Sequence, residues 1–80
     1  MVEAKVLPGG IVAQTLTVEQ AKNVLYRAGI DISREHIQQG LRDGPFPFGF
    51  AVRMTEYKYF IFRKKLADYI RDMTGLEVDI

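Results

Sequence analysis

The sequence has 80 residues, 48% of them hydrophobic, and a formal net charge of +1 at pH 7. This length suits one small domain, and the hydrophobic content excludes an intrinsically disordered chain. The chain has no cysteine and one histidine, His36, so we expect no disulfide, no metal centre and no cofactor. No apolar run approaches the ~18 residues of a membrane span, and no signal peptide is evident, so we expect a cytoplasmic protein.

The charges are distributed unevenly along the chain. The net charge is 0 over residues 1–33, +4 over 34–65 and −3 over 66–80. This pattern predicts a positive potential on the middle segment, where a polyanion would bind, although chance clustering in a small protein is the alternative.

Residues 1–15 are predicted to form an N-terminal arm. The apolar stretches at 6–7 and 11–13 flank Pro8-Gly9-Gly10, a break that allows at most two short extended pieces. Such an arm could fray, lie along the domain as an edge strand, or pair with another copy.

The clearest local signal is a capping box at Thr17 and Gln20, which predicts the start of a first helix that ends at Gly29. Its apolar residues fall within an arc of about 120° and are expected to face the core; they are Val18, Ala21, Val24, Leu25 and Ala28. The connector Ile30-Asp31-Ile32 then turns the chain, and its two isoleucines are expected to cap the core.

A second helix is marked at both ends, by Ser33 as N-cap and by Gly44 followed by Pro45. Ile37 and Leu41 lie four residues apart and anchor one face. The opposite face carries side chains able to bind base edges or phosphates: Glu35, Gln38, Gln39 and Arg42. We interpret this segment as a presented helix, the alternative being an ordinary solvated one.

A hairpin and a third helix complete the predicted domain, which spans residues 16–75. The prolines of residues 45–49 exclude helix, and strands are predicted around residues 50–54 and 57–62, with a turn near Thr55-Glu56. Leu66, Tyr69, Ile70 and Met73 recur at helical spacing up to Gly75. Residues 76–80 form a tail that the sequence does not assign.

The residues in this order resemble a winged helix-turn-helix of the excisionase and MerR type. The family's Leu-Thr-x-x-x-Ala pattern is matched by Leu16, Thr17 and Ala21, and its Ile-Ser-Arg-Glu start of the second helix by residues 32–35. Further matches are Ile37, Leu41, Gly44, Pro47, Tyr59, Ile61, Arg63, Leu66, Tyr69 and Ile70. The resemblance covers Leu16 to about Ile70 and implies an α+β, mostly α fold that binds double-stranded DNA.

In this family the second helix enters the major groove and the hairpin wing touches the DNA backbone or minor groove. The resemblance therefore implies groove contacts by Arg34, Gln38, Gln39 and Arg42, and wing contacts by Arg53 and Lys58. The basic pair Arg63 and Lys64 completes the predicted DNA-binding set. Two positions depart from the pattern: Gly40 lies inside the second helix, where it allows close packing against Phe46 or Phe48, and Glu56 replaces a basic wing tip.

Two functions follow as hypotheses. The first is a small phage or mobile-element protein, an excisionase-like architectural factor or a transcriptional regulator, which binds DNA with a second copy or a recombinase partner. The second is a protein-interaction module that uses the Phe46–Phe50 aromatic segment and the hairpin, without DNA binding. No nucleophile with a positioned base and no phosphate-binding glycine loop is visible, so we expect neither an enzyme nor a small-molecule substrate.

Overall fold

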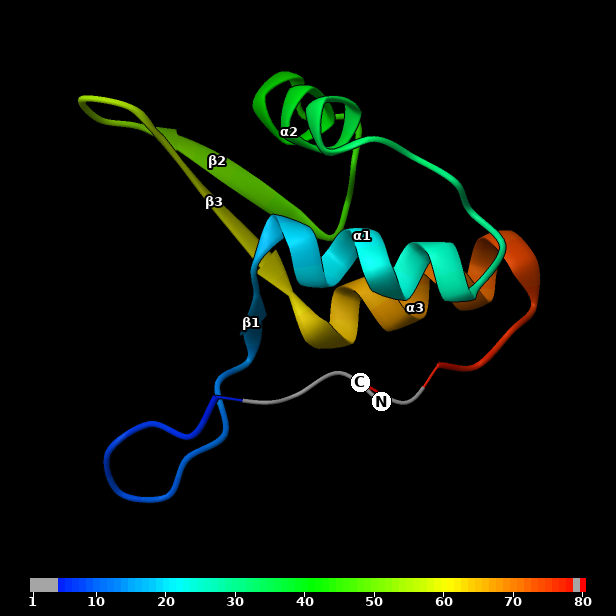
Figure 1. Ribbon diagram of the computed structural model, residues 1–80, viewed down its shortest axis with the longest axis horizontal. Coiled ribbons are helices and arrows are strands. Elements are labelled where there is room, and N and C mark those ends of the chain that lie inside the picture. Colours follow the sequence, from blue (N-terminus) through cyan, green and yellow to red (C-terminus); the bar gives the residue numbers. More distant parts are fainter. Residues whose placement is uncertain (1–4, 79) are drawn as a thin grey trace.

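The computed structural model describes residues 5–78 and 80, and within them the fold is α+β. Three helices accompany a three-stranded antiparallel sheet of order β1-β3-β2 (Figure 1). The elements are β1 (Thr15–Leu16), α1 (Val18–Arg27), α2 (Arg34–Asp43), β2 (Gly49–Arg53), β3 (Tyr57–Phe62) and α3 (Arg63–Thr74). In the same part of the chain, no helix has both the length and the apolar character needed to cross a membrane.

Helix α1 begins at the predicted capping box. The Thr17 hydroxyl accepts a hydrogen bond from the Gln20 backbone N–H (3.1 Å), and the Gln20 side chain accepts one from the Thr17 N–H (2.9 Å). At the other end Gly29 has a φ of 87°, the left-handed conformation that stops a helix. The predicted bounds of this helix are confirmed.

Helix α2 is confirmed with both of its predicted ends. The Ser33 hydroxyl accepts from the His36 backbone N–H (3.2 Å), and Gly44 adopts a left-handed φ of 89°. Ile37 and Leu41 are buried, as predicted. Gly40 is buried between them, and a Cβ atom at this position would overlap the Phe46 ring, so the glycine allows the close approach that its position predicted.

The hairpin is confirmed with a three-residue turn at 54–56. Strands β2 and β3 pair from Gly49↔Ile61 to Arg53↔Tyr57, and the Met54 N–H donates to the Glu56 carbonyl (3.1 Å). Strand β1 pairs with the base of β3, through Thr15↔Phe62 and Leu16↔Ile61. Thr15 therefore belongs to the sheet and not to an arm ending at residue 15, and the edge-strand alternative describes this part of the chain.

The core lies where α1, α2 and α3 meet the base of the sheet. It comprises Leu16, Ala21, Val24, Leu25, Ala28, Ile37, Leu41, Phe48, Ile61, Leu66 and Ile70. Ile30 and Ile32 of the connector pack against it, as expected, and so does the half-buried Tyr69, whose ring lies 5.2 Å from that of Phe48. In the tail, Val78 and Ile80 also pack against the core, while Asp79 lies outside the described residues.

Residues 5–13 form a small two-stranded arm that projects from the domain (Figure 1). Val6 bridges Val12, the Ala13 N–H donates to the Lys5 carbonyl (2.7 Å), and the Leu7 N–H donates to the Ile11 carbonyl (2.7 Å). The expectation of at most two short extended pieces around Pro8-Gly9-Gly10 is therefore confirmed for the described part of the arm.

Candidate nucleic-acid interface

The surface of α2 opposite its buried anchors is exposed and polar. Glu35, Gln39 and Arg42 are exposed, whereas Gln38 is half-buried on the flank that leads to Arg42 one turn later. The helix therefore presents two amides and one guanidinium on adjacent turns. These groups can bind base edges or phosphates, although Glu35 and Asp43 balance part of the positive charge.

Arg42 connects the end of α2 to the hairpin. Its guanidinium donates a hydrogen bond to the Tyr59 hydroxyl (2.7 Å) and lies 5.4 Å from the centroid of the Tyr57 ring. A cation over an aromatic face is held electrostatically, so the two tyrosines restrict where this guanidinium can go. The positive charge is thus fixed at the junction between α2 and β3.

The two predicted wing residues lie on opposite faces of the hairpin. Arg53 pairs with Tyr57 across the ladder and so shares the face that is turned toward α2. Lys58 pairs with Val52 on the other face, and its ammonium lies 3.9 Å from the Glu56 carboxylate. Only Arg53 therefore adds its charge to the side of the hairpin where Arg42 lies.

Arg34, at the start of α2, is already engaged by another residue of the chain. Its guanidinium forms an ion pair with Glu19 of α1, and the Nε atom donates at 2.6 Å. Both side chains remain about half exposed, at 53% and 54%. This pair ties α2 to α1, so a DNA contact by Arg34 would compete with Glu19.

Arg63 and Lys64 lie at the base of the sheet, at the opposite end of β3 from Tyr57. A six-residue strand is about 20 Å long, so these two side chains are well separated from the Arg42–Tyr57 contact. The Arg63 Nε atom is buried and has no hydrogen-bond partner among the described residues. The structure therefore brings Gln38, Gln39, Arg42 and Arg53 to one side and leaves Arg63 and Lys64 apart from them.

The aromatic segment of the alternative hypothesis is divided between core and surface. Phe48 is 1% exposed and stacks on the half-buried Phe46, with ring centroids 4.9 Å apart, so neither can anchor a partner. Phe50 is 46% exposed and stacks on Phe60 at 5.2 Å on the hairpin face turned away from α2. A contact patch can therefore use Phe50 and Phe60 but not the Phe46–Phe48 part.

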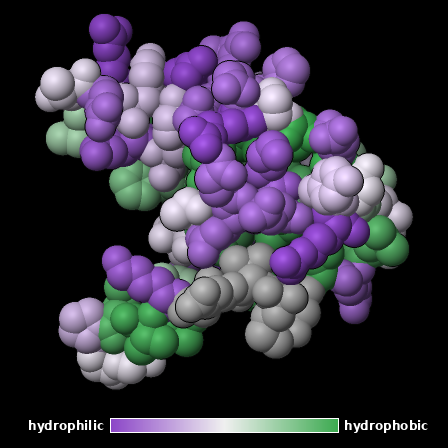
Figure 2. Space-filling model, viewed as in Figure 1, coloured by the Kyte–Doolittle hydropathy of each residue, from purple (hydrophilic) through white to green (hydrophobic). Residues whose placement is uncertain are grey.

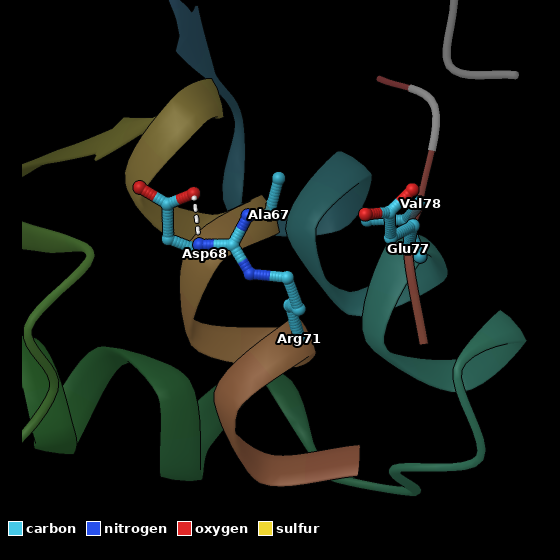
Figure 3. A pocket seen from close by; sticks show the side chains of 5 residues that line it. All are labelled: Ala67, Asp68, Arg71, Glu77 and Val78. Atoms are coloured by element: carbon cyan, nitrogen blue, oxygen red, sulfur yellow. Dashed lines mark hydrogen bonds and ion pairs between the residues drawn. The ribbon is translucent and has the colours of Figure 1, made fainter. Parts of the chain in front are cut away.

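A shallow cavity of about 150 Å³ lies between α3 and the tail (Figure 3). Asp68 and Arg71 project into it from α3 and form an ion pair at 3.2 Å, and Glu77 and Val78 line it from the tail. Its charged lining of one arginine and two carboxylates does not suit a polyanion. In the described part of the chain, no group of three or more histidine, cysteine or acidic residues could hold a metal ion.

Comparisons with known proteins return nothing: no family model, no curated protein and no solved structure matches this chain. The assignment of a function therefore depends on the surface that α2 and the hairpin present.

Sequence reasoning missed the residues that position the cations. Tyr57 and Tyr59 hold Arg42, and Glu19 holds Arg34. The two tyrosines alternate in a strand, so their period of two could have placed both on the face turned toward α2. The Glu19–Arg34 pair joins residues 15 apart in the sequence, and no local pattern indicates it.

Proposed function

We propose that this chain is a small winged helix-turn-helix protein that binds double-stranded DNA as an excisionase-like architectural factor or a transcriptional regulator. α2 would lie in the major groove, whose width admits a helix, and the hairpin would act as the wing on the backbone or minor groove. The observation that carries the proposal is Arg42, which two tyrosines of the hairpin hold at the open end of a helix capped at both ends.

Each side chain has a role in this arrangement. Gln38 and Gln39 carry amides that can bind adenine edges in pairs of hydrogen bonds, and Arg42 can bind guanine or a phosphate. Arg53 lies on the same side as Arg42 and would contact a phosphate, while Lys58 would contact the backbone from the other face of the wing. Arg34 would position α2 through Glu19 as well as reach the DNA.

The small number of cations limits the affinity of a single copy. Two or three phosphate contacts predict a salt slope of about −2 to −3 in a plot of log K against log salt concentration. A second copy or a recombinase partner would supply the further contacts that useful specificity requires.

The test is a fluorescence-anisotropy titration of a labelled duplex at several salt concentrations. We expect binding that weakens with salt, and an Arg42→Ala variant that binds about tenfold or more weakly, because one bidentate contact contributes ~1 to 3 kcal/mol. Arg71→Ala is the matched control, since Arg71 is an exposed arginine of α3 that is ion-paired with Asp68. Absence of binding at low salt, or equal losses in the two variants, would overturn the proposal.

A second candidate function rests on the exposed Phe50 and Phe60 of the hairpin, which are 46% and 38% exposed. In this alternative the outer hairpin face docks on another protein, and DNA is not bound. Aromatic docking would depend little on salt, so the same titration with a captured protein partner separates the two functions.

A further inference from the structure

The described part of the N-terminal arm carries an apolar surface that the domain does not cover. Val6 and Ile11 are each 63% exposed, Val12 is 41% exposed and Leu7 is 38% exposed. In Figure 2 these residues belong to a hydrophobic lobe at the lower left, set apart from the mainly hydrophilic surface of the domain. Four aliphatic side chains exposed together within eight residues form a contiguous patch, the kind of surface that marks an interaction site.

A notch of about 340 Å³ lies between the base of this arm and the hairpin. Its walls include Ala13 and Thr15 on one side and Tyr59 and Phe60 on the other. Lys5 and Ala13, at the base of the arm, themselves line the notch. The apolar tip of the same arm therefore projects beyond the notch and does not fill it.

The floor of the notch is an edge of β3 that lacks a strand partner. The Phe62 N–H donates to the Phe48 carbonyl on the β2 side (2.8 Å), and the alternation of an antiparallel ladder then directs the backbone groups of Tyr59 to the opposite side. On that side β1 reaches only Ile61 and Phe62 within the described chain. The backbone N–H and carbonyl of Tyr59 are thus presented to an incoming extended segment.

The arm has the complementary backbone. Ala13 and Leu7 use their N–H groups within the arm, on either side of the Val6↔Val12 bridge. The same alternation directs the N–H and carbonyl of Val6 outward, away from the strand of residues 11–13. An outward strand edge with apolar side chains and a notch with an unpaired strand edge are therefore both present on one molecule.

We propose that the chain forms a two-fold symmetric dimer in which the arm of each copy lies in the notch of the other, with the Val6 strand added to the β3 edge. The second copy is the occupant that supplies both halves of the contact at once, as an isologous interface requires. At the exposures given, the four side chains present roughly 350 Å² per arm, and covering both arms with an equal partner surface buries roughly 1,400 Å², within the range of stable interfaces. This dimer does not depend on DNA binding.

The first test is the molar mass of the full chain by sedimentation equilibrium without DNA. We expect a mass twice the 9.1 kDa of the monomer at micromolar to tens of micromolar concentration. Ile11→Asp should weaken the dimer by at least about 100-fold, because the substituted side chain is buried twice in a symmetric dimer. Met73→Asp is the control, since Met73 is also 63% exposed but lies on α3, and it should leave the dimer unchanged.

The second test locates the arm in the partner's notch and uses the absence of native cysteine. Chains with Ile11→Cys and chains with Phe60→Cys are mixed and oxidised, and we expect the mixed disulfide to form faster than either homodimer. A protein that stays monomeric at all concentrations overturns the proposal, as does a dimer that Ile11→Asp leaves intact. Preferential crosslinking between two Ile11→Cys chains would replace the notch by an arm-to-arm contact. Each result is independent of whether the chain binds DNA.

Discussion

Helix α2 and the N-terminal arm are segments of similar length that treat their apolar residues in opposite ways. In α2, Ile37 and Leu41 lie four residues apart, and both are buried. In the arm, Val6 and Ile11 lie on either side of Pro8-Gly9-Gly10, and both are exposed. A helix gathers residues at this spacing onto one face that can dock on a core, whereas the short arm extends past the core. The chain therefore has one surface fixed by the fold and another that is free to bind a partner.

The largest expected difference between the two regions is in stability. Leu41→Ala should lower the free energy of unfolding by ~2 to 5 kcal/mol, because it removes one of two large anchors of α2 and leaves a cavity. In a domain this small that loss is sufficient to prevent folding. Ile11→Ala in the arm should change stability by less than about 0.5 kcal/mol when measured on the monomer, as is usual for surface positions. Urea denaturation of both variants at low protein concentration measures the contrast, and equal losses would contradict it.

Gly40→Ala tests how closely α2 approaches its neighbours. Alanine favours a helix over glycine by ~1 kcal/mol, but the added methyl group would overlap the Phe46 ring, so we expect a net loss of about 1 to 2 kcal/mol. Gln39→Ala, on the exposed face of the same helix, is the control and should be close to neutral. A stabilised Gly40→Ala variant would show that Phe46 moves aside without cost.

Thr17→Ala should destabilise the domain by ~1 kcal/mol, since it removes the hydroxyl that caps α1. The matching change in the arm is Gln14→Ala, which removes a hydrogen bond from an exposed amide to the Val12 carbonyl (3.0 Å) and should have a smaller effect. Thermal melts of the two variants give the comparison. An unchanged melting temperature for Thr17→Ala would place the functional start of α1 elsewhere.

The smallest expected effects separate two kinds of DNA contact. Gln38→Ala should reduce discrimination at one base pair, whereas Lys58→Ala should weaken binding to all sequences about equally and reduce the salt slope by about one unit. Anisotropy titrations against a preferred duplex and a scrambled one measure both quantities. Sequence-selective loss in Lys58→Ala, or none in Gln38→Ala, would reverse the roles given to α2 and the hairpin.

The helices could be predicted because their ends carry local signals. Thr17 with Gln20, Ser33 with Gly44, and Gly75 each act within a few residues, so the sequence alone placed these boundaries. Pairing of Thr15 with Phe62 is non-local, and for that reason the boundary of the arm at residue 15 was wrong.

The candidate site was predictable as a set of residue types but not as an arrangement. The spacing of Ile37 and Leu41 identified the exposed side of α2, while the roles of Tyr57, Tyr59 and Glu19 depend on tertiary contacts. The separation of Lys58 from Arg53 follows from the register of the hairpin, whose turn has no glycine to indicate it. Arg63 and Lys64 were grouped with the site by sequence proximity, and the length of β3 places them at its far end.

The proposed DNA interface is tested most directly by a titration of ¹⁵N-labelled protein with a short duplex, followed by amide chemical shifts. The proposal predicts that the largest shifts occur in α2 and along the hairpin from Ala51 to Tyr59, and that the arm at residues 5–13 is unaffected. The indole-free chain still reports on Arg42 through its side-chain Nε–H signal, which should shift as its contact with Tyr59 changes. Shifts confined to the arm, or to Phe50 and Phe60, or no shifts at low salt, would contradict the proposed interface.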